Sequence, residues 1–506
     1  MSQSIEVTSP HPSISGFYKN KAIFITGGTG FIGKVMLQKL LYSCRDVHTV
    51  YLLVRDKKGV AASTRIKELK KIPIFEKLNK EAPEQFDKIK LIVGDITKSN
   101  LGIKEEDLNE LIKNVSVVFH IAAVLNFTDN LCKAYLHNVV PTKEVMKLSH
   151  RLTKLQVLVY VSTAYTNMNH SVIEEEVYLP PADLATIEYM ANNNLDKEFK
   201  KEILGGHVNT YVYTKLLAEN IVKASHSDIP VAIVRPSIVT SSLHGPKKGW
   251  MDNYNAASMI VAGIQTGVSR VILLSDDVVC DLVPVDLVAN ALLVCAARLT
   301  KPEVKVFNFT SGASNPITWG KFAREIVKSA YKHSTSFPWP YAVTVKSFSF
   351  YFPLAFVFQL VPSYLVHFIL LMFRKKSRIL DIQKKLMMFA IVTFPFTTQQ
   401  WLWSDRNVRE LIDTMTKEDQ KTFDIDVKNI NWINYFKDYT LGRASCATHW
   451  IHFHDFLDKI YVFLYFMLVL LIYFTKIIRV YTNMCCNNVL VCVRYKSLGD
   501  SCLLNK

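Results

Sequence analysis

Residues 23–33 restrict the possible folds of this chain more than any other segment. Apolar residues before Thr26 predict a buried strand, and Gly27, Gly30 and Gly33 follow as an amphipathic run begins at Phe31. In such a strand–turn–helix unit, glycines let the backbone approach a pyrophosphate, whose charge is stabilised by amides at the helix N-terminus. The segment therefore predicts a dinucleotide site. The residues assigned to this site are Thr26, Gly27, Gly28, Thr29, Gly30, Phe31, Ile32 and Gly33.

Short apolar runs alternate with helical patterns from residue 21 to about residue 295. The runs occupy residues 50–54, 91–93, 115–119, 155–161 and 231–234. This alternation is typical of an α/β fold with a doubly wound parallel sheet. We expect a Rossmann-type dinucleotide-binding domain over residues 15–300, with substrate-binding segments within residues 240–320.

Composition indicates contact with membranes and phosphates. The chain has 506 residues, 49% of them hydrophobic, and a formal net charge of +16 at pH 7. Anionic lipid surfaces and phosphate-bearing ligands fit this charge, whereas no nucleic-acid-binding motif occurs, so we expect no nucleic-acid partner. The nine cysteines show no paired metal spacing, and the polar N-terminal residues show no secretory signal. We expect no metal site and a catalytic part that faces the cytosol.

The alternation ends near residue 305, and residues 347–373 contain no Asp, Glu, Lys or Arg. This segment is long enough to enter a bilayer, but Pro353 and Pro362 disfavour one straight span. We favour an interfacial or re-entrant hairpin flanked by the basic residues 374–376. A buried core segment of a substrate domain is the alternative. We place a smaller, mainly helical C-terminal domain at residues 345–443.

A second uncharged segment, residues 460–475, lies between Lys459 and Lys476. A helix of this length spans about 24 Å, and the flanking lysines can extend it. We expect a C-terminal membrane anchor over residues 459–478, with a docking helix as the alternative. We therefore expect the protein to associate with a membrane, and we favour the endoplasmic reticulum over the peroxisome.

Arg55 indicates which dinucleotide binds. It follows the apolar residues 52–54, at a position where NAD enzymes place an acid to bind the ribose 2′-hydroxyl, whereas a cation accommodates a 2′-phosphate. Lys57, Lys58 and Arg65 add positive charge nearby. We therefore expect NADPH as the cofactor, with a solvated run of charges as the alternative.

The ends of the next two predicted strands offer further cofactor contacts. Asp95 and Ile96 follow the third strand, where an acid commonly contacts the adenine amino group. Ala122 and Ala123 follow the fourth strand, and their small side chains let a cofactor lie against the backbone.

Tyr211 and Lys215 are the candidate catalytic pair. Their spacing of four places them on one face of a helix. A neighbouring ammonium lowers the pKa of a phenol and can hold the nicotinamide ribose hydroxyls. Tyr213 points elsewhere on such a helix, so we exclude it.

Three further polar residues complete the candidate site. Thr163 ends the fifth predicted strand and offers a hydroxyl to orient a substrate carbonyl, with Ser162 as the second choice. Asn138 lies in a predicted helix where its amide can support a water relay to the lysine, although a lone Asn more often makes structural hydrogen bonds.

These motifs, in this order, resemble those of the fatty acyl-CoA reductases of animals, including insects, over about residues 15–442. The glycine spacing is that of extended short-chain dehydrogenase/reductases. The matching segments are residues 26–33, 53–59, 161–165, 209–215, 234–239, 249–253, 281–286 and 315–319. The later segments are the more family-specific ones. Pro141 and the stretch after Gly442, with Cys446 and His449, depart from the family pattern.

The resemblance implies an extended short-chain reductase domain, a sterile-like C-terminal domain and membrane association. It implies reduction of a long-chain acyl-CoA to a primary alcohol by two NADPH. Thr163 and Tyr211 would donate hydrogen bonds to the developing oxyanion, and Arg235, Pro236 and Ser237 would contact the cofactor. Two alternatives stay open: a membrane-bound dehydrogenase for sterols or sugar nucleotides, and a non-catalytic NADPH-binding regulator.

Overall fold

The computed structural model describes residues 12–57, 59–193, 195, 204–333 and 341–446. Its centre is a seven-stranded sheet in which every neighbouring pair is parallel, with the strand order β11-β7-β5-β4-β1-β2-β3. The order reverses between β1 and β4, and ligands of such sheets bind at the carboxyl ends of the strands beside this point. The strands are β1 (Ala22–Thr26), β2 (Thr49–Val54), β3 (Ile89–Val93), β4 (Val115–His120), β5 (Val157–Val161), β7 (Val231–Pro236) and β11 (Val304–Phe309). The predicted α/β fold is confirmed.

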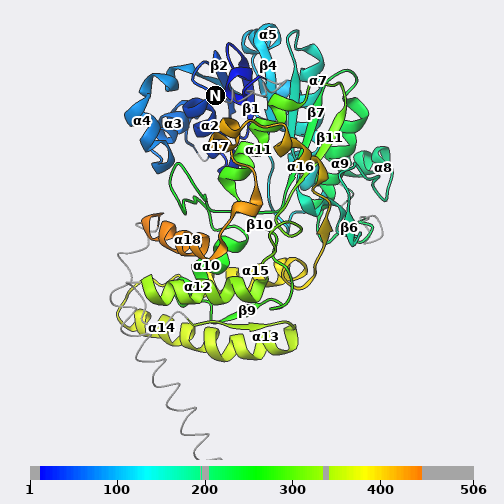
Figure 1. Cartoon of the computed structure of the whole chain (residues 1–506). Helices are drawn as coiled ribbons and strands as arrows, with labels where there is room; N and C mark the ends of the chain where they lie inside the picture. The colour runs from blue at the N-terminus through cyan, green and yellow to red at the C-terminus, as the bar shows by residue number, and fades with distance from the viewer. Residues whose placement is uncertain (1–11, 58, 194, 196–203, 334–340, 447–506) are drawn as a thin grey trace, which may run out of the picture.

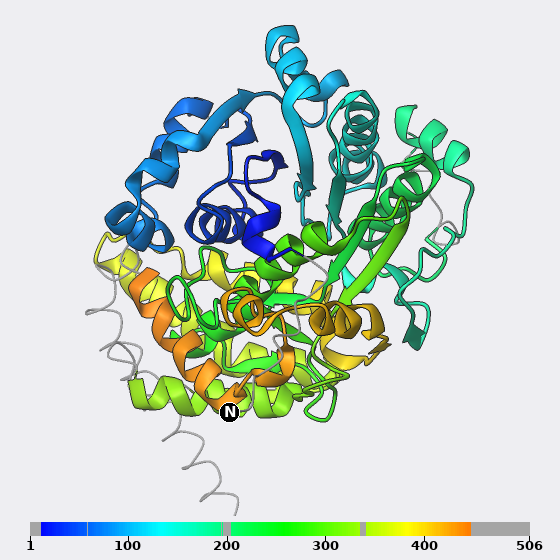
Figure 2. The same ribbon diagram turned by 45° about the horizontal axis from the view of Figure 1, so that its top comes forward.

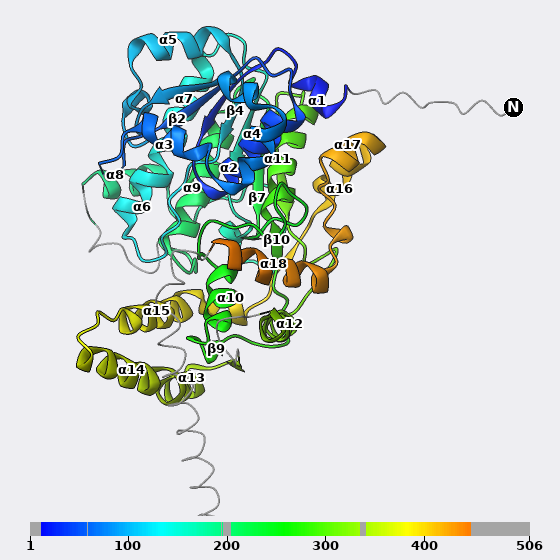
Figure 3. The same ribbon diagram turned by 90° about the vertical axis from the view of Figure 1, so that its left-hand side faces the viewer.

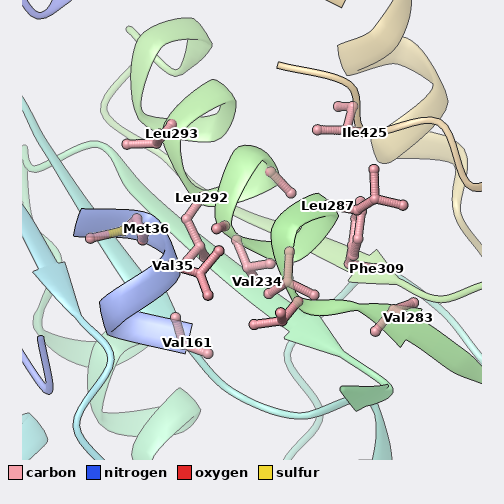
Figure 4. Close-up of a cluster of buried hydrophobic side chains, with 14 of the residues drawn as sticks. Val35, Met36, Val161, Val234, Val283, Leu287, Leu292, Leu293, Phe309 and Ile425 are labelled. Atoms are coloured by element: carbon pink, nitrogen blue, oxygen red, sulfur yellow. The ribbon is translucent and has the colours of Figure 1, made fainter. Parts of the chain in front are cut away.

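Helices cover both faces of this sheet (Figures 1 and 2). On one face, α2 (Phe31–Ser43) and α11 (Val285–Arg298) pack on the apolar side chains of the central strands, as Figure 4 shows. On the other face lie α5 (Glu105–Asn114), α7 (Val140–Arg151) and α9 (Thr210–Ser225). Because the central strands are buried on both faces, they contain continuous apolar runs rather than alternating ones.

A second layer lies beyond the carboxyl ends of the strands (Figure 3). It contains α10 (Ala257–Gln265), α12 (Trp319–His333), α15 (Ile379–Thr398) and the parallel pair β9 (Val271–Leu273) and β12 (Val343–Val345). Its outermost part is formed by α13 (Phe348–Ala355), a π-helical turn (Phe356–Leu360) and α14 (Val361–Met372). The indole N–H of Trp319 donates to the Phe396 carbonyl at 3.2 Å and so ties α12 to α15.

The predicted hairpin at residues 347–373 is wrong. The residues Phe348–Met372 form one helix of 25 residues, long and apolar enough to cross a membrane by length and composition. Pro353 lies inside α13, and Pro362 follows the π-helical turn directly, at the second residue of α14. The π-helical turn between the two prolines accommodates the irregular hydrogen bonding, so the chain continues without reversing.

This long helix has one buried stripe and one exposed apolar face. The buried residues recur every three to four positions and pack on β9 and α15. They are Tyr351, Ala355, Gln359, Pro362, Ser363, Val366 and Leu370. The exposed apolar side chains include Phe350, Phe352, Phe356, Val357, Tyr364, Leu365, Phe368, Leu371 and Met372.

The chain then returns to the sheet domain. The strand β13 (Leu402–Trp403) pairs with β6 (Val172–Ile173), and α16 (Arg406–Asp413) and α17 (Lys417–Thr422) follow. Arg298 of α11 forms a buried ion pair with Asp419 at 3.0 Å. The last described helix, α18 (Trp432–Cys446), runs beside α12 (Figure 1). Residues 402–422 therefore pack on the sheet domain, whereas α18 packs on the second layer. The predicted anchor at residues 459–478 lies outside the described residues.

The remaining elements are short. They are α1 (Ile14–Phe17), α3 (Ala62–Leu69), η1 (Pro73–Phe75), α4 (Glu76–Glu81), η2 (Pro83–Lys88), η3 (Ser99–Gly102), α6 (Leu131–Asn138), η4 (Ala164–Asn167), α8 (Leu184–Asn192), β8 (Ile238–Thr240), β10 (Leu282–Pro284) and η7 (Val427–Asn429).

Candidate active site

The turn after β1 requires glycine at two positions. Gly27 has a φ of 79°, and a Cβ there would lie 2.6 Å from the Ala122 nitrogen. A Cβ on Gly33 would lie 2.2 Å from the Gly27 oxygen. Gly30 directly precedes α2 and has no side chain to cap it, so the amides of the first turn are left to a ligand. This geometry fits a dinucleotide pyrophosphate.

A cavity of 330 Å³ opens at the carboxyl ends of β1, β4, β5 and β7. It brings together most of the predicted residues from five separate parts of the chain. The predicted residues that line it are Gly27, Gly30, Phe31, Ile32, Gly33, Ala122, Ala123, Ser162, Thr163, Tyr211, Lys215, Pro236 and Ser237. Aromatic side chains of the second layer close it, among them Trp319, Phe389 and Phe396. The site therefore lies between the sheet and the second layer.

Lys215 is buried beside the end of β5. Its Nζ donates to the Val161 carbonyl at 2.6 Å and lies 4.2 Å from the centre of the Tyr160 ring. Burial lowers the pKa of Lys215 to about 7, against a smaller opposite effect of Glu219. Lys215 and Val161 both line the cavity, so the ammonium lies within the site proposed for the cofactor.

Tyr211 lies on the same face of α9, with its ring 5.9 Å from that of Phe127. Burial raises the pKa of Tyr211 above its ordinary value. The expectation that Lys215 lowers this pKa is therefore wrong for the structure described, because the ammonium bonds to Val161 and desolvation of the phenol dominates. The phenol is protonated at neutral pH, which is the form that donates a proton.

Thr163 and Ser162 both line the cavity. The Thr163 oxygen accepts the Tyr165 amide at 3.4 Å, which leaves its O–H available to donate. The Ser162 oxygen has no hydrogen-bond partner among the described residues. Because the Ser162 oxygen is buried, the geometry favours Thr163 as the donor to a substrate carbonyl, with Ser162 behind it.

Asn138 lies in α6, and it does not line the cavity. Its amide oxygen accepts the Val124 N–H at 2.9 Å, and its amide nitrogen donates to the Thr214 hydroxyl at 3.1 Å. These bonds join the segment after β4 to α9. These contacts occupy the side chain and favour the structural alternative, so the water relay through Asn138 stays a prediction.

Arg235 also lies away from the cavity. Its guanidinium forms a bidentate ion pair with Glu219 of α9, at 2.9 and 2.6 Å, and both side chains are fully buried. Further N–H groups donate to the Glu174 and Glu176 carbonyls. The expected contact of Arg235 with the cofactor is corrected for this reason, whereas its neighbours Pro236 and Ser237 do line the cavity.

The positively charged end of the site lies beyond the glycine loop. Arg55 at the end of β2 has its Nη1 3.9 Å from the Asp95 carboxylate at the end of β3. Arg65 of α3 donates to the Arg55 carbonyl at 2.6 Å and to the Thr29 hydroxyl at 3.0 Å. Arg65 thus contacts the glycine loop, although 36 residues separate it from Thr29 in the sequence. Ile96 packs into the apolar cluster on one face of the sheet instead of facing the cavity.

Two features around the site were not predicted from the sequence: the buried His120 behind Thr26 and the aromatic wall from α15. His120 hydrogen-bonds through Nδ1 to the Thr26 hydroxyl at 2.7 Å, and burial, together with the Lys215 charge, lowers its pKa to about 3, so it is neutral. Thr26 thus faces this buried histidine. Gly28 packs against the Leu52 side chain of β2. The aromatic wall from α15 was also missed, since no local pattern shows where that helix packs.

A larger cavity, of 540 Å³, lies between α2, α11 and the residues around α17. None of the predicted site residues lines it. Its charged residues have both signs, with Lys39, Lys77 and Lys421 near Asp286 and Asp424. We therefore take the smaller cavity, which contains the predicted catalytic residues, as the candidate active site.

Two parts of the chain match family models described as male sterility protein, over residues 25–292 and residues 358–445. Fatty acyl-CoA reductase 1 of Homo sapiens is 35% identical over 443 residues, which cover 86% of each chain. Fatty acyl-CoA reductase 2 of Mus musculus is 31% identical over 439 residues, which cover 85% of each chain.

Solved structures share the fold at lower identity. A reductase domain of a nonribosomal peptide synthetase from Mycobacterium tuberculosis has a TM-score of 0.59 at 17% identity, covering 87% of this chain and 94% of its own. The terminal R domain of the myxalamid pathway has a TM-score of 0.57 at 19% identity, covering 85% and 91%. The family matches, together with relatives 35% identical over most of the chain, show that this protein belongs to the fatty acyl-CoA reductase family.

Proposed function

We propose that this protein reduces long-chain fatty acyl-CoA to primary alcohols with NADPH. The observation that carries the proposal is the cavity in which Tyr211, Lys215 and Thr163 face an apolar wall from α15. The polar side has the donors that carbonyl reduction needs, and the aromatic side suits an alkyl chain. The names of the relatives give the substrate class.

The residues of the chain act on the thioester carbonyl. NADPH bound on the glycine loop supplies the hydride to the carbonyl carbon. Thr163 and Tyr211 donate hydrogen bonds to the oxygen as negative charge develops there, and Tyr211 transfers its proton to it. The hemithioacetal expels CoA as the thiol and leaves an aldehyde. A second NADPH would then reduce the aldehyde, and Tyr211, reprotonated from solvent, would donate the second proton, so each acyl-CoA would consume two NADPH.

This route needs no cysteine nucleophile. Cys44, Cys280 and Cys295 are buried, and desolvation raises the pKa of each thiol above its ordinary value. None of the described cysteines lines the cavity. A thiol held protonated in this way is a poor nucleophile, so an acyl-enzyme is not part of the proposal.

Arg55 and Arg65 support NADPH over NADH, because both guanidiniums lie at the end of β2 where a 2′-phosphate would sit. Replacing both with Ala should raise the KM for NADPH by about tenfold or more, since a hydrogen bond to a charged group contributes about 1.5–3 kcal/mol. The KM for NADH should change little. Steady-state kinetics with each cofactor measure this, and an equal change for both would contradict the proposed preference.

We also propose that membrane lipid is a partner, through the exposed apolar face of Phe348–Met372. Its buried stripe packs on the protein along the whole length of the helix, and Gln359 and Ser363 in that stripe hydrogen-bond to the residues beside it. A helix fixed in this way lies in the plane of the membrane surface. The exposed basic residues Arg374, Lys375, Lys376, Arg378, Lys384 and Lys385 follow and suit anionic headgroups. We keep the cytosolic face of the endoplasmic reticulum as the proposed site.

The substrate class is tested with the full-length protein in detergent micelles. We expect NADPH oxidation with palmitoyl-CoA, and no oxidation with NADPH plus a keto-sterol or a keto-sugar nucleotide. Turnover of either alternative substrate, with palmitoyl-CoA inert, would contradict the proposal. Cofactor binding without turnover of any of these substrates would favour a non-catalytic NADPH-binding protein.

A further inference from the structure

The cavity beside Tyr211 is small for its ligands. Its 330 Å³ must receive both the nicotinamide and the reacting end of the acyl-CoA, whereas pockets for a single drug-sized ligand occupy about 300–1,000 Å³. The distal part of a long acyl chain therefore needs further apolar space. On the proposed function, that space has to adjoin the cavity on its apolar side.

A second, nearly filled cavity of 20 Å³ lies on that side. Ile260, Phe389, Thr393 and Thr397 line both cavities and so form the wall between them. The far cavity lies among α10, β9, α13 and α15. Its other lining residues are Met259, Ser269, Val271, Ile272, Leu273, Tyr351, Leu386 and Ala390.

The wall between the cavities presents apolar atoms, although it contains two threonines. The Thr393 hydroxyl donates to the Phe389 carbonyl at 2.7 Å, and the Thr397 hydroxyl donates to the Leu273 carbonyl at 3.0 Å. Both hydroxyls are thus used by the backbone. An alkyl chain passing this wall would leave no polar group without a partner.

The far cavity ends under the helix Phe348–Met372. Tyr351 of α13, only 2% exposed, closes it, and Ala355 is buried beside it in the same cluster. On the opposite side of α13, Phe350 and Phe352 are exposed. The line from Tyr211 through the two cavities therefore leads toward the face that we propose to contact lipid.

We propose that the distal acyl chain binds in the seam between α15, α10 and α13, and that Phe389 and Tyr351 set the chain length the enzyme accepts. This inference rests on the proposed function and specifies its substrate site. Phe389 separates the two cavities, so its half-buried ring turns aside when a long chain binds. Tyr351 forms the far end. Short chains end before Phe389 and need only the cavity beside Tyr211.

The first test fills the far cavity. Ala390 lines only that cavity, so Ala390→Phe should leave the reacting centre unchanged. We expect the ratio of kcat/KM for palmitoyl-CoA to that for decanoyl-CoA to fall by about tenfold or more, because even one methylene in an apolar pocket can discriminate by about tenfold. Activity with decanoyl-CoA should persist, and it shows that the variant folds and performs the chemistry.

The second test opens the wall. Phe389→Ala joins the cavities and should raise the ratio of kcat/KM for docosanoyl-CoA to that for palmitoyl-CoA severalfold. Met388→Ala is the matched control, because Met388 is the preceding residue on α15 but is 52% exposed and lines neither cavity. Its ratios should equal those of the wild type.

The outcomes separate the two proposals. A wild-type protein that reduces none of the acyl-CoAs would contradict the proposed function itself. An active wild type whose chain-length ratios are unchanged in both Ala390→Phe and Phe389→Ala would overturn only the acyl seam. If Ala390→Phe fails to fold, Phe389→Ala against Met388→Ala decides the question alone.

Discussion

Burial sets the protonation states of the catalytic pair at the scale of single residues. The phenol of Tyr211 is kept protonated, and the ammonium of Lys215 is brought close to losing its proton. The Tyr–Lys spacing predicted the two residues correctly as neighbours on one helical face, because that geometry is local. The direction of the tyrosine shift could not be predicted, since it depends on how much of the cavity wall covers the ring.

Lys215 should make stability depend on pH. Its pKa is about 7 in the folded protein and about 10.4 in an unfolded chain, so the unfolded state binds more protons between these values and stability rises with pH in this window. In Lys215→Met this contribution is absent. The midpoint of thermal unfolding of the variant should therefore exceed that of the wild type most at pH 6, with the difference shrinking toward pH 9. A difference that stays constant with pH would contradict the low pKa.

The Arg235–Glu219 pair should matter for folding and not for cofactor affinity. Arg235→Met leaves the Glu219 carboxylate buried without its partner, which costs about 3–5 kcal/mol of unfolding free energy. Replacing Glu219 with Leu as well should recover most of that loss. Denaturant unfolding measures the stability, and the KM for NADPH of the double variant should match the wild type. A raised KM in a stable double variant would return Arg235 to the cofactor site.

The long apolar helix shows what the sequence can and cannot predict at the scale of secondary-structure elements. Its lack of charged residues correctly predicted an apolar segment that is long enough to cross a membrane. The two prolines led to a predicted hairpin, because the rule that proline ends a helix is local. Packing of Tyr351, Gln359 and Val366 on β9 and α15, together with the π-helical turn, supports a continuous helix instead.

The proposed in-plane orientation of this helix gives a sharp prediction. Single cysteines at Phe350, Val357 and Phe368, all exposed, can carry a fluorophore in the full-length protein bound to vesicles. Quenching by lipids with spin labels at different depths should place all three positions at one shallow depth, because the helix lies along the protein surface. A steady increase of depth from one position to the next would show that the helix spans the bilayer.

The whole molecule is organised around the face between the sheet and the second layer. The glycine loop and the strand ends carry the residues proposed to bind the cofactor and to catalyse the reaction, and these were predicted from runs of neighbouring residues. The apolar wall of the cavity, which we propose to hold the acyl chain, comes from α15, far along the chain, and was not predicted. Trp401 and Trp403 fix this arrangement, since their indole N–H groups donate to the Met168 and Ala164 carbonyls at 2.9 and 2.8 Å, beside Thr163.

In the proposed reaction, Tyr211 supplies the proton while two NADPH reduce one acyl-CoA to an alcohol. The most direct measurement counts NADPH consumed and hexadecanol formed from palmitoyl-CoA by the full-length wild type and by Tyr211→Phe. We predict two NADPH per alcohol for the wild type, and a rate lower by about 100-fold or more for the variant, as loss of a general acid requires. Hexadecanol formed at the wild-type rate by Tyr211→Phe would show that Tyr211 does not supply the proton.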